Sequence, residues 1–329
     1  MALDLDFSGK RILIAGDLVA DQFLSGTIAR VSREAPVFIL RHDETETRPG
    51  AAANTAANVA SLGGEAILIG VVGDDANARL LFDALGSSVD TSRVLTVAGD
   101  RTTTKLRVLA AQHYAARQQV IRIDYENSRT LSDDLRRTLQ ANLISACEGV
   151  DAIVLSDYGY GVVDDELFAT ARRIAEEDRI PLIVDSRSRL GELSGATSAT
   201  PNQEEVEQLV GVDFTEADCE LLREKLGLRS LVVTRGNKGM LVVEEGRPSV
   251  SIDAVGSSEP VDVTGAGDTV TAAYALGLAA GLSFVEAARI ANHAGGIVVM
   301  KKGTATVTAD ELARSLTEHL EPPQAVPAT

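Results

Sequence analysis

Tryptophan is absent from this sequence of 329 residues, cysteine occurs twice, and basic residues are outnumbered, with 31 Lys and Arg against 48 Asp and Glu. Cys147 and Cys219 lie far apart, and no C-x-x-C or histidine pair at metal-ligand spacing accompanies them. A structural zinc site or a disulfide framework is therefore not expected. The formal net charge of −17 argues against nucleic acid or an anionic membrane as the main partner, because either requires a basic surface.

Long apolar runs are missing as well. No stretch of 18 uncharged apolar residues occurs, and the first nine residues carry Asp4 and Asp6 where a signal peptide would be basic and then apolar. We therefore expect a cytoplasmic protein with no membrane partner. The 45% share of hydrophobic residues is ample for a packed core, in one large α/β domain or two smaller ones.

Short apolar runs alternate with helical patterns along most of the chain. The patterns predict strands at 10–16, 152–156, 181–185 and 230–234, a hairpin around 240–250, and helices at 131–147, 164–178, 203–210 and 216–226. Several of the strands end in an acid or a threonine, as in a sheet whose carboxyl edge carries a binding site. This alternation predicts a doubly wound, mostly parallel sheet flanked by helices.

Two segments, at about 17–48 and 102–125, interrupt this alternation. Polar and apolar residues alternate in both, so we expect antiparallel strands with one face exposed to water. Together they predict a small β lid on a single domain that spans residues 1–320. The last residues, 321–329, contain three prolines and are predicted to be a disordered tail.

A glycine-rich stretch at 261–269 reads V-D-V-T-G-A-G-D-T and precedes an apolar run at 270–282. Small residues at Gly265, Ala266 and Gly267 allow a tight turn, whose N–H groups would form an anion cradle if a helix follows. Asp268 would lie at the edge of this cradle, where a carboxylate can take a proton from an attacking hydroxyl. Alternatively, the stretch is only a turn that caps a helix. A dinucleotide-binding turn is disfavoured because Val270 occupies the place of its third glycine.

Three motifs in this order resemble those of the PfkB family of carbohydrate kinases, over about 10–312. From the N-terminus they are G-A-A-A-N at 50–54, N-x-x-E at 202–205, and D-V-T-G-A-G-D-T at 262–269. Within the family, the sequence is similar to the heptose kinases of ADP-heptose synthesis at 16–21, 30–36, 48–50, 104–109, 122–124 and 155–158. The resemblance implies a ribokinase-like fold and an ATP- and Mg²⁺-dependent sugar kinase. Its acceptor would be the anomeric hydroxyl of D-glycero-D-manno-heptose 7-phosphate.

The resemblance also implies roles for individual residues. Asp268 matches the catalytic base, and the anion hole corresponds to Gly265, Ala266 and Gly267. The nucleotide-binding positions are Asn202, Thr234, Arg235, Gly236, Gly239 and Asn292, and the substrate-binding positions are Asp17, Asp21, Arg48, Gly50, Asn54, Lys105, Arg107 and Arg122. Glu205 would hold Mg²⁺ through water, and Asp262 and Thr264 would hold an optional monovalent cation such as K⁺.

Several of these residues have a second interpretation. Lys105 and Arg107 share one face of a strand, because strand side chains repeat every second residue, and with Arg48 they could clamp a phosphate. Equally, they could be edge charges that oppose aggregation of the sheet. Asn202 could be a helix cap, and Asn292 a polar residue on an amphipathic helix.

Three positions depart from the family pattern. Ala51 replaces the second glycine of a Gly-Gly pair at the lid hinge, Tyr160 replaces a lysine of the heptose kinases, and Ser186-Arg187 replaces Pro-Lys. Other acceptors therefore stay open: ribose, fructose phosphates or a nucleoside such as adenosine. A sugar or nucleotide sensor without catalysis is a further alternative. A small isolated sheet is marginal in water, so we also expect a homodimer that pairs through the lid.

Overall fold

The body of the molecule is built on one large sheet. The computed structural model describes residues 6–112, 115, 117–127, 130–257 and 259–318. Within these residues the sheet has nine strands, in the order β15-β14-β13-β12-β11-β10-β1-β4-β6, and only β14 and β15 pair antiparallel to their neighbours. Its strands are β1 (Arg11–Gly16), β4 (Glu65–Ile69), β6 (Val89–Asp90), β10 (Ala152–Asp157), β11 (Leu182–Ser186), β12 (Ser198–Ala199), β13 (Ser230–Thr234), β14 (Met240–Glu244) and β15 (Val250–Ile252).

Helices cover both faces of this sheet, because its central strands are apolar on both sides. Alternate residues of β1 point to opposite faces, with Ile12 and Ile14 in one core cluster and Leu13 and Ala15 in the other. The helices are α1 (Ala52–Ser61), α2 (Ala76–Leu85), α3 (Asp133–Ala146), α4 (Asp165–Asp178), α5 (Gln203–Val210), α6 (Glu216–Lys225), α7 (Ala266–Ala279), α8 (Phe284–Val298) and α9 (Ala309–Glu318). The predicted class, a mostly parallel sheet flanked by helices, is confirmed.

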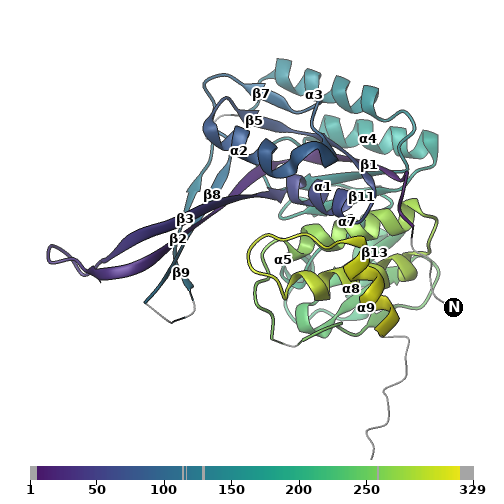
Figure 1. Ribbon diagram of the computed structural model, residues 1–329. Helices are drawn as coiled ribbons and strands as arrows, with labels where there is room; N and C mark the ends of the chain where they lie inside the picture. The colour runs from purple at the N-terminus through teal and green to yellow at the C-terminus, as the bar shows by residue number, and fades with distance from the viewer. Residues whose placement is uncertain (1–5, 113–114, 116, 128–129, 258, 319–329) are drawn as a thin grey trace, which may run out of the picture.

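A second sheet projects from the body (Figure 1). It has the order β3-β2-β8-β9, and its strands are β2 (Leu18–Val31), β3 (Phe38–Ala51), β8 (Thr104–Ala111) and β9 (Gln118–Tyr125). These strands fall in the two segments from which we expected a lid, and we call this sheet the lid. The expectation of antiparallel strands was wrong for one pair: β2 and β8 run parallel, although β2–β3 and β8–β9 are antiparallel. Every residue of β9 is exposed.

Other local expectations differ in their boundaries. Helix α7 begins at Ala266 rather than at 270, so Asp268 lies inside its first turn. A small sheet of β5 (Val71–Gly73) and β7 (Leu95–Val97) lies in a region for which we made no prediction. The predicted tail at 321–329 lies outside the described residues. Among the described helices, none is both long and apolar enough to span a membrane.

The junction between the lid and the body is strained at Ala51. Strand β3 ends there and α1 begins at the next residue, so the chain must turn sharply, and Ala51 adopts φ 54° and ψ −133°. This region of backbone conformation is normally reserved for glycine, and another residue held there costs about 1–3 kcal/mol. Ala51, in place of a second glycine, therefore keeps the turn between the lid and the body but strains its backbone.

Ala51→Gly is expected to stabilise the protein. Relief of the backbone strain stabilises the folded state by more than the greater conformational entropy of glycine in the unfolded chain destabilises it. We therefore expect a melting temperature about 2 °C higher, which corresponds to about 1 kcal/mol in a chain of this size. Ala57→Gly, at a helical position in α1, is the matched control and should lower the melting temperature instead. Equal destabilisation by both variants in a thermal melt would show that Ala51 is not strained.

Candidate active site

Acidic side chains from several elements converge at the carboxyl edge of the large sheet. Asp157 ends β10, Asp185 lies near the end of β11, and Asp268 lies in the first turn of α7. Burial raises the pKa of Asp185 well above its ordinary value, and the negative charges of Asp268 and Glu205 raise it further. This edge is where open α/β sheets bind ligands, so we take it as the candidate site.

Asp268 is the most constrained of these acids. Its side chain is buried, with Asn54 Nδ2 donating to one carboxylate oxygen at 2.8 Å and the Tyr158 hydroxyl donating to the other at 2.7 Å. Burial raises the pKa of Asp268 to about 7, although both hydrogen bonds act to lower it. A carboxylate with such a pKa can accept a proton near neutral pH, as a general base does.

Tyr158→Phe is expected to shift the pH dependence of activity. Only ionised Asp268 can accept a proton, so activity should rise with pH through about 7. Loss of the Tyr158 hydroxyl removes a hydrogen bond to the ionised Asp268 carboxylate and so raises the pKa of Asp268. The rise of activity with pH should then occur about one pH unit higher. The Tyr160 hydroxyl binds Glu126 instead of Asp268, so the activity of Tyr160→Phe should rise with pH at the same point as in the wild type. Coincident pH–rate profiles for all three proteins would contradict the role of Tyr158.

The glycine-rich turn lies directly beside Asp268. Gly265 has φ 77°, and a Cβ atom there would come within 2.5 Å of Asn54 Nδ2, so the turn needs glycine. Asn54 also donates to the Gly265 carbonyl at 3.2 Å, which fixes the turn against α1. Gly267 is exposed and its N–H has no acceptor within the helix, whereas the Ala266 N–H donates to the Val263 carbonyl at 3.2 Å. The turn therefore offers an anion site at the positive end of α7.

Asp17 and Asp21 occupy different environments. The Asp17 carboxylate is buried and accepts backbone N–H groups of Tyr158, Tyr160 and Val162 at 2.8–3.1 Å. It therefore holds the loop that presents Tyr158. Asp21 instead binds Arg107 at 2.6 Å and the Thr304 hydroxyl at 2.8 Å. Gly50 packs against Asp21, where a Cβ atom would meet its carboxylate at 2.7 Å.

The basic residues expected to bind substrate share one face of the lid. Arg107 is directly opposite Phe23 on β2 and Arg122 on β9, and Lys105 is directly opposite Asp21 and Asp124. Burial lowers the pKa of Lys105, and the positive charge of Arg187 from the body adds to this effect. The Lys105 ammonium also lies 5.7 Å from the centre of the Tyr160 ring. These three cations therefore face the body near Arg187.

Arg48 lies at the base of the lid and has other partners. It binds Glu46 at 2.8 Å, donates to the carbonyls of Lys302 and Thr304, and lies 5.6 Å from the centre of the Phe23 ring. Arg122 is paired with Asp124 at 2.9 Å and is about half exposed. Both guanidiniums are thus occupied in this structure, Arg48 with the body and Arg122 with its own strand.

Except for Asn292, the residues expected to bind the nucleotide lie near the ends of β12 and β13. Asn202 caps α5 in a reciprocal pair with Glu205, and its backbone bridges to Thr234. Gly236 and Gly239 form the turn after β13, where a Cβ on Gly239 would overlap the Ile252 carbonyl. Arg235 donates to Met240 and Ser251 beside this turn. Asn292 lies on α8 and donates to the Asp253 carbonyl at 2.7 Å.

Asp262 and Thr264 belong to a loop that packs against residue 303. The Asp262 carboxylate accepts the N–H groups of Thr264 and Gly303, both at 2.9 Å. Partial burial acts to raise the pKa of Asp262, but these bonds prevail and lower it. Within the described residues, no group of three His, Cys, Asp or Glu side chains is arranged to hold a metal ion. The predicted monovalent-cation site stays a prediction.

Sequence reasoning gave no role to Tyr158, Asp185, Thr304 or Arg187, all of which adjoin the predicted residues. Arg187 is 5.6 Å from the centre of the Tyr158 ring, and its charge acts on Asp185, Asp268 and Lys105. The signal that was available is position: Tyr158 and Arg187 directly follow β10 and β11, at the edge where the site was expected.

Comparisons with known proteins agree with this geometry. A family model described as pfkB family carbohydrate kinase matches residues 27–311. The chain is 39% identical over 320 residues to the bifunctional protein HldE of Shewanella baltica and 40% identical over 326 residues to that of Shewanella amazonensis. Each alignment covers 95% of this chain, which spans 65% of the relative's length.

Solved structures share the fold at lower identity. A ribokinase of Arabidopsis thaliana complexed with ribose and ATP superposes with a TM-score of 0.69 at 22% identity, covering 94% of this chain and 99% of that one. Phosphofructokinase-2 of Escherichia coli in complex with substrates and products gives a TM-score of 0.75 at 21% identity, covering 95% and 100%. At these identities the match concerns the fold alone.

Proposed function

Because this chain belongs to the pfkB family of carbohydrate kinases and is therefore a phosphotransferase, we propose that it transfers the γ-phosphoryl group of ATP to the anomeric hydroxyl of D-glycero-D-manno-heptose 7-phosphate. Phosphorylation of a sugar is the activity common to the family. The choice of acceptor rests on the motifs that resemble those of heptose 7-phosphate kinases, and on the charge of the site.

The observation that carries the choice of acceptor is the concentration of cations around the candidate site. Lys105, Arg107 and Arg122 share the inner face of the lid, and Arg187 adds a fourth charge from the body. Arg107 and Arg122 pair with Asp21 and Asp124, but Lys105 and Arg187 have no ion-pair partner among the described residues, so these two cations need another reason in a chain with a net charge of −17. A substrate that already bears a phosphate supplies one, because guanidinium and ammonium groups bind phosphate oxygens.

In this proposal each group near Asp268 has a defined task. Asp21 and Asn54 orient the sugar, so that its anomeric hydroxyl reaches Asp268. Asp268 takes the hydroxyl proton as the oxygen bonds to the γ-phosphorus of ATP, and the bond from that phosphorus to the β–γ bridging oxygen breaks to release ADP. Tyr158 and Asn54 hold the carboxylate in place. The Gly267 N–H stabilises the negative charge on the transferred phosphoryl group, and the Ala266 N–H joins it on releasing the Val263 carbonyl. Phosphoryl transfer needs little beyond this positioning and charge stabilisation.

Glu205 is the residue that would hold Mg²⁺ through water. Mg²⁺ usually keeps several waters and contacts only one or two carboxylates together with substrate phosphates, so a single protein acid is enough. One Glu205 oxygen binds the Asn202 N–H at 2.8 Å, and the carboxylate lies close enough to Asp185 to affect its pKa. When bound, Mg²⁺ would neutralise charge on the nucleotide phosphates.

Glu205→Gln is expected to raise the Mg²⁺ concentration needed for half-maximal activity by about tenfold, the usual effect of weakening a residue that supports a metal site. Glutamine can keep the helix cap, so the variant removes the charge and little else. Glu286→Gln, in the same kind of cap on α8, is the matched control. An unchanged Mg²⁺ requirement in Glu205→Gln, measured by activity titration, would exclude the metal role.

A coupled assay of ADP release tests the proposed function. The acceptors to compare are D-glycero-D-manno-heptose 7-phosphate, fructose 6-phosphate, ribose and adenosine. We expect the highest kcat/KM for the heptose phosphate. If an unphosphorylated sugar or adenosine has the highest value, the proposed acceptor is wrong while the family assignment stands. No ADP release with any acceptor would favour a sensor.

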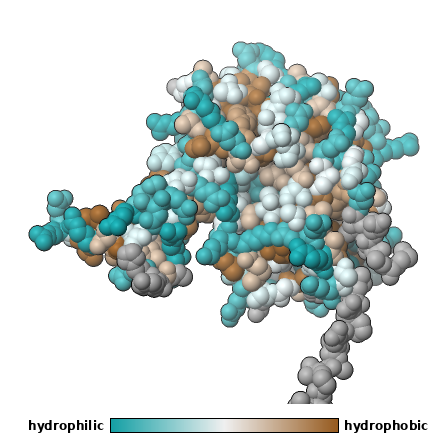
Figure 2. Space-filling view, in the orientation of Figure 1, coloured by the Kyte–Doolittle hydropathy of each residue, from teal (hydrophilic) through white to brown (hydrophobic). Residues whose placement is uncertain are grey.

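We propose further that two copies of the chain pair through the lid. Several large hydrophobic residues of the lid are exposed, including Val37, Phe38, Val120, Ile121 and Ile123, and Figure 2 shows such residues near the outer end of the projection. An exposed apolar sheet needs a partner, and a second lid in a closed dimer would provide one. A monomer at micromolar concentration in light scattering would disprove this pairing.

A further inference from the structure

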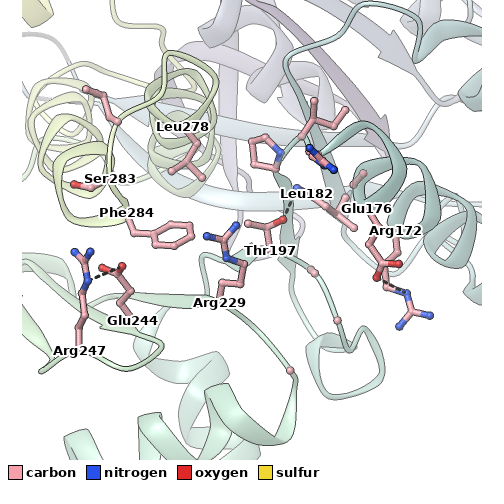
Figure 3. A pocket seen from close by; sticks show the side chains of 18 residues that line it. Arg172, Glu176, Leu182, Thr197, Arg229, Glu244, Arg247, Leu278, Ser283 and Phe284 are labelled. Carbon is pink, nitrogen blue, oxygen red and sulfur yellow. Dashed lines mark hydrogen bonds and ion pairs between the residues drawn. The ribbon is translucent and has the colours of Figure 1, made fainter.

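A cavity of about 630 Å³ opens at the edge of the sheet opposite the candidate active site. It lies where β11, β12 and β13 begin and where α4 and α7 end, and Leu182, Thr197 and Leu278 are among its walls (Figure 3). Its volume is in the range of small-molecule sites. None of the residues assigned to the kinase reaction lines it.

Four arginines line this cavity, which we call the arginine pocket. Arg172 lies on α4 and Arg179 directly follows that helix. Arg229 directly precedes β13, and Arg247 follows β14. Two acids accompany them, Glu176 and Glu244. The pocket therefore carries a net positive charge in a chain that has 17 more acidic than basic residues.

The pairing of these arginines is incomplete. Arg172 is 3.9 Å from Glu176, and Arg247 is 3.3 Å from Glu244, as Figure 3 marks. Within the described part of the chain, neither Arg179 nor Arg229 has an ion-pair partner. Arg229 instead lies 5.5 Å from the centre of the Phe284 ring, which holds the guanidinium while its donors stay available.

A structural role accounts for only part of the cluster. Arg179 is the C-cap of α4, where positive charge is favourable, but Arg172 lies in the middle of the helix and gains little from this effect. Yet Arg179 has φ 59°, a left-handed position that glycine usually fills, and Arg229 and Arg247 are not on a helix at all. The adjacent start of α8 is already capped by Ser283 with Glu286, so it does not explain the arginines either.

We propose that the arginine pocket is a second binding site, which takes a small organic phosphate. Guanidinium groups bind phosphate oxygens in pairs, and the unpaired Arg179 and Arg229 together with the weakly paired Arg172 supply the donors. Nucleotides and sugar phosphates share this chemistry. Two elements run from the pocket to the catalytic edge: β11 begins at Leu182 and contains Asp185, and α7 begins beside Asp268 and contains Leu278.

Calorimetric titration of the full chain with inorganic pyrophosphate tests this site. A non-hydrolysable ATP analogue with Mg²⁺ is kept saturating, so that the nucleotide site is filled. We expect one binding event in the wild type, at least about tenfold weaker in Arg229→Glu, because a charge-assisted phosphate contact is lost and a repulsive one is gained. Arg173→Glu, a charge reversal on α4 outside the pocket, is the matched control and should bind as the wild type does.

Arg107→Glu distinguishes this event from binding under the lid. If binding survives in Arg107→Glu and is weakened in Arg229→Glu, the arginine pocket is the site. Wild-type affinity in Arg229→Glu, loss of the event in Arg107→Glu, or no binding to the wild type at millimolar pyrophosphate would each overturn the proposal. Should Arg229→Glu fail to fold in a thermal melt, Arg179→Gln, at an exposed position, carries the same expectation of weakened binding.

Further titrations with AMP and with ribose 5-phosphate separate the two sources of the phosphate. A tighter event for AMP identifies a nucleotide, and a tighter event for ribose 5-phosphate identifies a sugar phosphate. Either result supports the site only if Arg229→Glu weakens the binding of that ligand. Because the pocket shares no residue with the reaction, this test can fail while the kinase assay succeeds, and the reverse also holds.

Discussion

Asp268→Asn is expected to lower kcat by roughly 10²- to 10⁴-fold, the usual contribution of a positioned general base. Asparagine has nearly the same shape and can still accept a hydrogen bond from Tyr158, but it cannot accept the proton of the sugar hydroxyl. Affinity for ATP should change little, because the side chain faces Asn54 and Tyr158 rather than the residues near Asn202. Steady-state kinetics with both substrates measure the two effects separately.

Two further measurements sharpen this test. The wild type should lose activity below about pH 7, as Asp268 becomes protonated, whereas the residual activity of Asp268→Asn should not follow that limb. Asp185→Asn is the matched control, since it removes another carboxylate from the same edge. A near-normal kcat in Asp268→Asn, or a pH limb near 7 that persists in Asp268→Asn and disappears in Asp185→Asn, would mean that Asp268 is not the base.

Arg107→Glu is expected to raise KM for a phosphorylated sugar by roughly 10²-fold and to leave KM for ATP within about twofold. The substitution removes a guanidinium contact worth about 1.5–3 kcal/mol and adds repulsion between carboxylate and phosphate. It also breaks a nearly buried ion pair, because the side chains of Arg107 and Asp21 are only 12% and 7% exposed. The variant should therefore melt at a lower temperature as well.

The substrate comparison separates recognition from stability. Arg107→Glu should impair a phosphorylated sugar far more than the same sugar without its phosphate. Arg117→Glu makes the same charge change on the lid, at an exposed residue paired with Asp43, and should leave both KM values unchanged. If Arg107→Glu affects both kinds of sugar equally, Arg107 acts only through Asp21 and has no part in choosing the substrate.

Local patterns predicted the body of the fold well, since each element is set by its own residues. Helix α5 spans 203–210 as predicted, and the strand predicted at 10–16 is observed at Arg11–Gly16. The arrangement of the strands in the lid was harder to predict from the sequence. Alternation of polar and apolar residues shows that β2 and β8 are strands, but it carries no information on which strands pair or in which direction. Their parallel pairing depends on the path of the chain through α1, β4 and α2.

The candidate site was predictable where a short motif defines it. Asp268 follows two glycines, and Gly265 has the positive φ that such a turn requires. Asp17 and Asp21 could not be told apart, because both are acids after the same strand. Only the folded loop shows that Asp17 accepts N–H groups while Asp21 faces Arg107. Tyr158 reaches Asp268 across a long sequence separation, which no local pattern encodes.

The parallel pairing of β2 with β8 also limits the order in which the chain can fold. β2 and β3 are consecutive and can pair as soon as both have been synthesised, but the other edge of β2 stays open until β8 follows α1, β4 and α2. During that interval the backbone groups at 20–27 can pair with another chain, as exposed strand edges do. Completion of this long-range pairing is intrinsically slow, so a chaperone that covers β2 should raise the yield of refolded protein.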